Sequence, residues 1–312
     1  MRKALVVGIN AYPKSPLYGC INDATAVGDL LETHADGSRN FDVQLEVNVG
    51  SRSVLRTEIV KLFRGSFETV LLYFSGHGFI NELGGYIVTP DSKRYDEGIL
   101  MDEILKLAND SKSINKIIIL DCCYAGAMGS PSILGNGASF INEGVTILTA
   151  SKCDEPSTEI NGHGIFTTLL IDALNGAAAD LTGYVTPGSI YTHIDKALGP
   201  FDQRPVFKAN THKFISLRSA EPPISPKALR NITSYFTKID AKKALDRTYE
   251  WTNAEAIDDH VKIFKELKKM QSVGLVAPIE GNDLYWAAQN CGSCELTALG
   301  KYYWSLVTKK RI

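Results

Sequence analysis

The sequence predicts an α/β fold in which a mostly parallel sheet is covered by helices on both faces, followed by a smaller second domain. Two observations support this prediction. Short apolar runs rich in Val, Ile and Leu alternate with amphipathic stretches over the first 220 residues. A proline-rich segment, Glu221–Pro226, then separates this part from the rest of the 312-residue chain. We therefore expect domains at 1–219 and 227–312, joined by a linker at 220–226.

The apolar runs are the expected strands, and the amphipathic stretches between them are the expected helices. In the stretch that begins at Ser51, Leu55, Ile59 and Leu62 fall on one helical face, and Gly65 follows as a stop signal. Further helices are expected at 22–33, 98–109, 163–175 and 187–198. The expected strands are Lys3–Ile9, Gln44–Val49, Thr69–Ser75, Lys116–Leu120 and Val145–Ala150, with Arg204–Phe207 as a sixth strand at a sheet edge, where proline is tolerated.

Composition excludes several classes of protein. With 44% hydrophobic residues, 22% charged residues and a net charge of -2, the chain is globular, and nothing indicates that the whole chain binds nucleic acid. Six cysteines are too few for a disulfide scaffold, so we expect reduced thiols. No apolar stretch approaches the length of a membrane span, so we expect no membrane association and a cytoplasmic location.

Polar, glycine-rich turns follow two of the expected strands, and the carboxyl ends of such strands meet at one edge of a sheet. His77 lies in the turn after the third strand, and Cys122 and Cys123 lie after the fourth. A neighbouring histidine favours the reactive thiolate, and the amides of Gly78 and of the cysteine are suitable donors for an oxyanion. The alternative is that His77 is a turn residue and both cysteines are inert core thiols. Spacing alone leaves both interpretations open.

The two turns also carry a family resemblance. Tyr73–Gly78, followed by Asp121–Gly126, resembles the paired motifs of caspase-like cysteine peptidases of the metacaspase branch. The resemblance covers roughly residues 1–217 and implies a six-stranded caspase-like sheet. Further segments agree with it, namely Ala4–Asn10, Gly19–Ala24, Thr149–Ser151 and Gly164–Thr168.

The resemblance implies a cysteine endopeptidase in which Cys123 is the nucleophile and His77 is the general base and acid. Cys122 would then be a neighbour that takes no part in the chemistry. The rival hypothesis is a catalytically silent sensor or adaptor, although the intact His77 and Cys123 argue against it. Three other histidines have no comparable partner motif and are expected to be structural or surface residues: His163, His193 and His212.

The resemblance also implies a pocket for the residue before the scissile bond. Asp23 and Asp121 would form its floor, and Cys20 and Ser75 would line it. Two carboxylates attract a guanidinium or an ammonium group and repel an acidic side chain, so we expect cleavage of protein substrates after Arg or Lys. The alternative for Asp23 is an ordinary charge at the start of a helix.

Metacaspases commonly bind calcium through several aspartates, and this sequence has few of them. Asp102 is followed by Glu103 where paired aspartates are typical, and Ser130 stands where the family often has another Asp. Calcium requires six to eight oxygen ligands. We therefore expect no metal or other cofactor, activity without added calcium, and surface roles for Asp91, Asp96 and Asp102.

In residues 227–312, a basic helix carries Ile257, Val261, Phe264 and Leu267 on one face, Leu284–Trp286 is predicted to be an aromatic strand, and Leu296–Gly300 opens a last helix. This order of elements resembles a winged helix-turn-helix module. We expect this domain to bind a regulatory protein partner, with DNA as the alternative, because lysines on one helix are most often a solvated face. Cys291 and Cys294 have the spacing of zinc ligands but no second pair.

Overall fold

The computed structural model describes residues 1–94, 96–128, 140–150, 159–160, 163–199, 204–211 and 213–312. The chain divides into two compact units, Met1–Glu221 and Pro222–Ile312, and each is described by itself. His212, and most of the turn that contains Ser130, lie outside the described residues.

The first unit is built on a six-stranded sheet with the strand order β12-β8-β7-β3-β1-β2. Every neighbouring pair is parallel except β12 and β8, which are antiparallel. The predicted α/β architecture is therefore confirmed, with the proline-preceded strand at an edge as expected. The strands are β1 (Arg2–Gly8), β2 (Asp42–Val47), β3 (Thr69–Ser75), β7 (Asn115–Asp121), β8 (Val145–Thr149) and β12 (Val206–Asn210).

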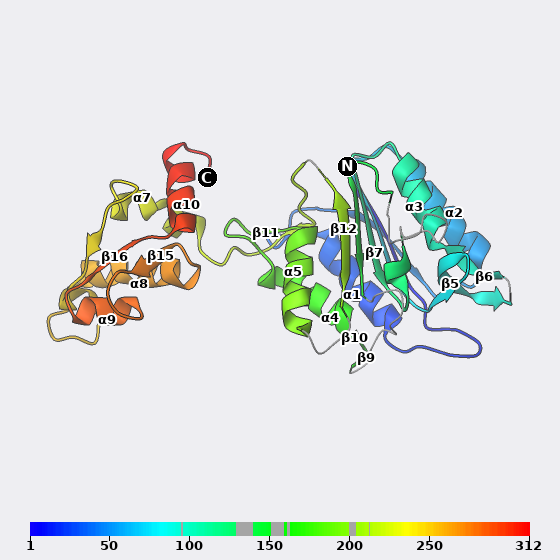
Figure 1. Ribbon diagram of the computed structural model, residues 1–312, viewed down its shortest axis with the longest axis horizontal. Helices are drawn as coiled ribbons and strands as arrows, with labels where there is room; N and C mark the ends of the chain where they lie inside the picture. The colour runs from blue at the N-terminus through cyan, green and yellow to red at the C-terminus, as the bar shows by residue number, and fades with distance from the viewer. Residues whose placement is uncertain (95, 129–139, 151–158, 161–162, 200–203, 212) are drawn as a thin grey trace. The chain divides into compact units, whose positions relative to one another are not determined.

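Helices cover both faces of this sheet (Figure 1). Alternate strand residues point to opposite faces, so Leu5 and Val7 belong to one apolar core, and Ala4 and Val6 belong to the other. The first core lies under α2 (Arg52–Arg64) and α3 (Met101–Asp110), and the second lies under α1 (Cys20–Glu32), α4 (Ile165–Asp172) and α5 (Pro187–Leu198).

The helix α2 shows how the sequence defines its own ends. The Ser51 hydroxyl accepts a hydrogen bond from the Val54 amide at the first turn, and Gly65 follows the last residue. Leu55, Ile59 and Leu62 are buried on its inner face, as predicted.

A three-stranded antiparallel sheet after β3 was missed by the sequence analysis. It consists of β4 (Gly78–Asn81), β5 (Gly84–Lys93) and β6 (Asp96–Leu100). The helix predicted over 98–109 is therefore wrong at its start, because residues 98–100 belong to β6. Gly98 has φ 153°, and a side chain there would lie 2.1 Å from the Ile87 carbonyl oxygen, so the two strands approach closely at this glycine.

Short elements complete the unit. A 3₁₀ turn, η1 (Ala125–Ala127), follows the cysteines, and a π-helical turn, η3 (Ala173–Ala177), extends α4. Two antiparallel pairs join β9 (Glu159–Ile160) to β10 (His163–Gly164), and β11 (Tyr184–Val185) to β13 (Arg218–Ser219).

The second unit contains a small antiparallel sheet with the strand order β14-β16-β15. Along the chain, helices come before, between and after these strands. Phe264 and Leu267 are buried residues of its basic helix. Ile257 precedes that helix and is 48% exposed, so the prediction that the apolar helical face includes Ile257 is wrong. The elements are α6 (Pro226–Arg230), α7 (Ile232–Tyr235), β14 (Lys243–Ala244), η4 (Arg247–Tyr249), α8 (Asp258–Ser272), β15 (Val276–Pro278), α9 (Leu284–Gln289), β16 (Ser293–Leu296) and α10 (Ala298–Thr308).

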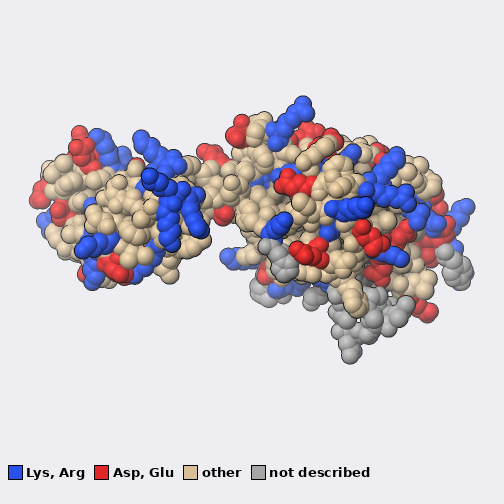
Figure 2. All heavy atoms as spheres, turned by 90° about the horizontal axis from the view of Figure 1, so that it is seen from above, with Lys and Arg blue, Asp and Glu red and all other residues tan. Residues whose placement is uncertain are grey.

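The predicted aromatic strand Leu284–Trp286 is wrong, because these residues form the first turn of α9. The Asp283 carboxylate accepts a hydrogen bond from the Trp286 amide at 2.9 Å and so starts a helix. The winged-helix resemblance of this unit remains a prediction. Figure 2 shows Lys and Arg side chains on one face of the unit, with Asp and Glu among them.

Candidate active site

The register between β3 and β7 brings the two predicted catalytic residues to one edge of the sheet. Ser75 pairs with Asp121, and the Gly76 amide continues the ladder by donating to the Asp121 carbonyl at 3.3 Å. His77 and Cys123 each follow two residues after that last pair. Both are half-buried, which suits groups that must meet a substrate.

Gly78 contacts the backbone of Cys123. A Cβ atom built on Gly78 would lie 1.9 Å from the Cys123 carbonyl oxygen and 3.2 Å from its amide nitrogen. Only glycine allows this approach. The two amides that were predicted to bind an oxyanion therefore belong to residues whose backbones are in contact, while their role remains a prediction.

The imidazole of His77 is held by the loop that follows β1. Its Nε2 atom lies 2.7 Å from the Ser15 carbonyl oxygen, which can only accept a hydrogen bond. Nε2 therefore carries a proton, and in the neutral ring Nδ1 is the basic nitrogen. The sequence analysis missed Ser15, because a contact through a backbone carbonyl leaves no signature in residue type.

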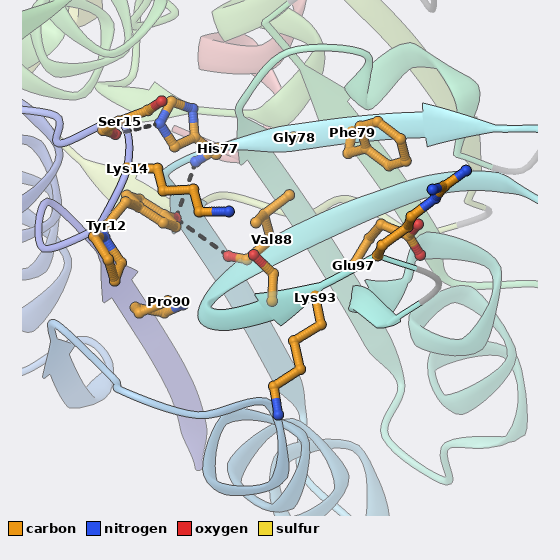
Figure 3. Close-up of a pocket in the computed structure, with 13 residues that line it drawn as sticks. Tyr12, Lys14, Ser15, His77, Gly78, Phe79, Val88, Pro90, Lys93 and Glu97 are labelled. Atoms are coloured by element: carbon orange, nitrogen blue, oxygen red, sulfur yellow. Dashed lines mark hydrogen bonds between the residues drawn. The ribbon is translucent and has the colours of Figure 1, made fainter.

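Tyr12, in the same loop, was also missed. Its hydroxyl accepts from the His77 amide at 3.0 Å and donates to the Val88 carbonyl at 3.2 Å (Figure 3). Its ring centroid lies 4.5 Å from that of the His77 imidazole. Burial raises the pKa of Tyr12, so the hydroxyl keeps the proton that this arrangement needs.

The two adjacent cysteines have different surroundings. Cys122 is fully buried, and burial raises the pKa of its thiol well above the ordinary value. A thiol that stays protonated is a poor nucleophile. Cys123 is the more accessible of the two, which agrees with its predicted role.

The four residues predicted to form the substrate pocket lie on the α1 and α4 side of the same edge, and all are buried: Cys20, Asp23, Ser75 and Asp121. Asp23 is in the first turn of α1 but does not cap it. Instead, its carboxylate accepts hydrogen bonds from His163 Nδ1 at 2.7 Å and from the Gly164 amide at 3.1 Å. Burial raises the pKa of the Asp23 carboxyl, against the lowering effect of these bonds and of one from Ser75.

Asp121 and Asp23 both lie against Gly164. A Cβ atom on Gly164 would lie 2.5 Å from Asp121 Oδ2, and the Gly164 amide donates to Asp23, so this glycine contacts both carboxylates. The same Oδ2 accepts a hydrogen bond from the Thr167 hydroxyl at 2.6 Å, and the Tyr73 hydroxyl oxygen lies 2.6 Å from that of Thr167. His163, which was expected to be structural or at the surface, thus contacts a residue of the candidate pocket.

Two of the aspartates considered for calcium have other partners. Asp91 accepts from the Arg52 amide at the start of α2 and from the Thr89 hydroxyl, and Asp96 forms an ion pair with the Arg52 guanidinium. Within the described ranges, no three His, Cys, Asp or Glu side chains are grouped so that they could hold a metal ion. Calcium-independent activity remains a prediction.

Comparisons with known proteins bear on the family and the fold of this chain. No curated protein matches the chain. The crystal structure of protein GSU0716 from Geobacter sulfurreducens is similar in fold, with a TM-score of 0.52 and 16% identity, over 70% of this chain and 97% of that one. A family model, the caspase domain, matches residues 1–215. Because that match spans more than half of the chain and includes both strand-end turns, the chain belongs to the caspase-domain family of cysteine peptidases.

Proposed function

We propose that this protein is a cysteine endopeptidase that uses Cys123 and His77 as a catalytic dyad and cleaves after Arg or Lys. The observation that carries this proposal is the register between β3 and β7, which sets both residues two positions beyond one paired end. A histidine and a half-buried thiol at one sheet edge are suited to acyl transfer.

The chemistry follows from the orientation of His77. Nδ1 takes the Cys123 thiol proton, and Sγ then attacks the scissile carbonyl carbon. The same nitrogen gives the proton to the leaving amine as the C–N bond breaks, which leaves a thioester on Cys123. A water molecule then hydrolyses the thioester, with Nδ1 accepting its proton and returning it to the departing Sγ. Throughout, Nε2 donates to the Ser15 carbonyl, which fixes the ring and favours the transient imidazolium.

Selection of a basic residue follows from the buried carboxylates. Asp23 and Asp121 are 1% and 5% exposed. A buried carboxylate is costly unless donors or a cation compensate it. A guanidinium from the substrate would satisfy both groups with charge-assisted hydrogen bonds, whereas an Asp side chain would be repelled.

The second unit is proposed to regulate this activity by binding a protein partner. Three exposed lysines follow one another along α8, namely Lys262, Lys265 and Lys269, and Lys262 pairs with Asp259. Exposed lysines of this kind are a weak basis for DNA recognition, so DNA remains the alternative partner.

The proposal is tested with fluorogenic peptides that end in Arg, Lys or Asp before the reporter amine. We expect the wild-type protein to cut the Arg and Lys peptides in chelator, Cys123→Ala to cut none, and Cys122→Ala to retain cleavage. Cleavage by Cys123→Ala at the wild-type rate, or a preference for Asp, would overturn the proposal.

A further inference from the structure

A cavity begins at His77, on the opposite face of the sheet from the candidate carboxylate pocket. Its volume is about 580 Å³, and it is bounded by the loop after β1, by His77 and Phe79, and by β5 (Figure 3). Of its wall residues, Tyr12 belongs to the core under α2 and α3 and Val88 packs against that core. The helices α1 and α4, which carry Asp23 and Thr167, pack on the other face. The His77 edge of the sheet therefore lies between the two sites.

The proposed reaction decides which part of the substrate reaches each site. The residue before the scissile bond remains attached to Cys123 as the thioester, and its side chain enters the carboxylate pocket. The leaving amine must lie beside His77, which gives it a proton. The substrate residues that follow the scissile bond therefore begin at the His77 end of the cavity.

The cavity carries an excess of positive charge. Lys14 and Lys93 line it, and neither forms an ion pair within the part of the chain that the structure describes. Arg94 and Glu97 also line it and carry opposite charges. In Figure 3 the Lys14 side chain extends into the space between His77 and Val88, while Lys93 points away from His77.

We propose that this cavity binds the substrate segment after the scissile bond, and that Lys14 selects acidic side chains in it. The inference rests on the proposed function. Phe79 and Val88 supply apolar wall for the stems of these side chains, and the lysine ammonium supplies the charge that their carboxylates need. The protein would then favour sites at which a basic residue is followed by acidic ones.

The test uses internally quenched peptides that share one Arg before the scissile bond and differ only in carrying Asp, Ala or Lys at each of the next three positions. The readout is the ratio of kcat/KM for Asp over Lys at one position, which does not depend on the fraction of folded enzyme. For a solvent-accessible pair we expect a ratio of about five to ten at one or more positions, decreasing when salt is raised from about 0.05 to about 0.5 M.

Two charge reversals complete the test. Lys14→Glu should bring the ratio to one or below. Lys196→Glu makes the same charge change on an exposed residue of α5, on the far face of the sheet, and should leave the ratio unchanged.

Equal cleavage of the Asp and Lys peptides, or an Asp preference that Lys14→Glu retains, would overturn the inference while leaving the proposed function in place. A fluorogenic Arg peptide with no residue after the scissile bond is assayed beside them. If neither that peptide nor any quenched peptide is cut, the proposed function fails and this inference fails with it.

Discussion

The contact between Gly78 and Cys123 makes a sharp prediction for Gly78→Ala. The new methyl group would lie 1.9 Å from the Cys123 carbonyl oxygen, where ordinary contacts begin at 3.4 Å. The three atoms nearest to the methyl group all belong to the Cys123 backbone, so no side chain can rotate away. The turn that carries His77 and the turn that carries Cys123 must therefore separate.

The size of the effect follows from this overlap. Relief requires a shift of about 1.5 Å between the two turns, and a displacement of about 1 Å at reacting groups can cost roughly a hundredfold in rate. We therefore expect kcat to fall at least about a hundredfold. The free energy of unfolding should fall by about 1 to 3 kcal/mol, because the added methyl overpacks a close contact.

The assay compares kcat for an Arg peptide with the thermal melting of the same preparation. Gly50→Ala is the matched control, because nothing lies within 4 Å of a Cβ atom at that position. It should keep full activity and gain about 0.4 to 1 kcal/mol of stability from the less flexible unfolded chain. A Gly78→Ala protein with the melting temperature and the kcat of the wild type would refute the reasoning.

Three further predictions concern the proposed dyad and the candidate pocket. Iodoacetamide at neutral pH should alkylate Cys123 and spare the buried Cys122, as mass spectrometry of the digest would show; equal labelling of both would contradict the assignment. Tyr12→Phe leaves the His77 amide and the Val88 carbonyl without their hydrogen-bond partner. We therefore expect the free energy of unfolding, measured in urea, to fall by about 1 to 3 kcal/mol, and kcat to fall at unchanged KM. The carboxyl of Asp23 has a raised pKa and loses its charge as pH falls through that value, so KM for an Arg peptide should rise on the acidic side, whereas KM for the citrulline analogue should not.

Much of the first unit could be predicted because its signals lie in residue type. The buried strands are continuous apolar runs, and the turns after β3 and β7 carry the family motifs, so His77 and Cys123 could be placed at one edge. The strand β6 could not be predicted in this way. Residues 98–100 continue an amphipathic pattern into α3, and only the tertiary contact at Gly98 makes them a strand.

The groups that hold the site in place were missed for a different reason. Ser15 acts through its backbone carbonyl, and Tyr12 acts through a hydroxyl that reaches the backbone of two distant segments. His163 reaches Asp23 across 140 positions of sequence. None of these contacts requires a local pattern of residues, so only the folded chain brings them together.

One short connection, from the end of β1 to the first turn of α1, links these observations. Its loop is closed on itself by hydrogen bonds from the Tyr12 and Leu17 amides to the Asn10 carbonyl. From this segment the Ser15 carbonyl reaches the imidazole, Lys14 lines the cavity beyond it, and Asp23 belongs to the candidate pocket on the other face of the sheet. Because Tyr12 ties the loop to His77, a change in the length of this connection should alter turnover and selectivity on both sides of the scissile bond together, and a variant that changed only one of them would show that the subsites are independent.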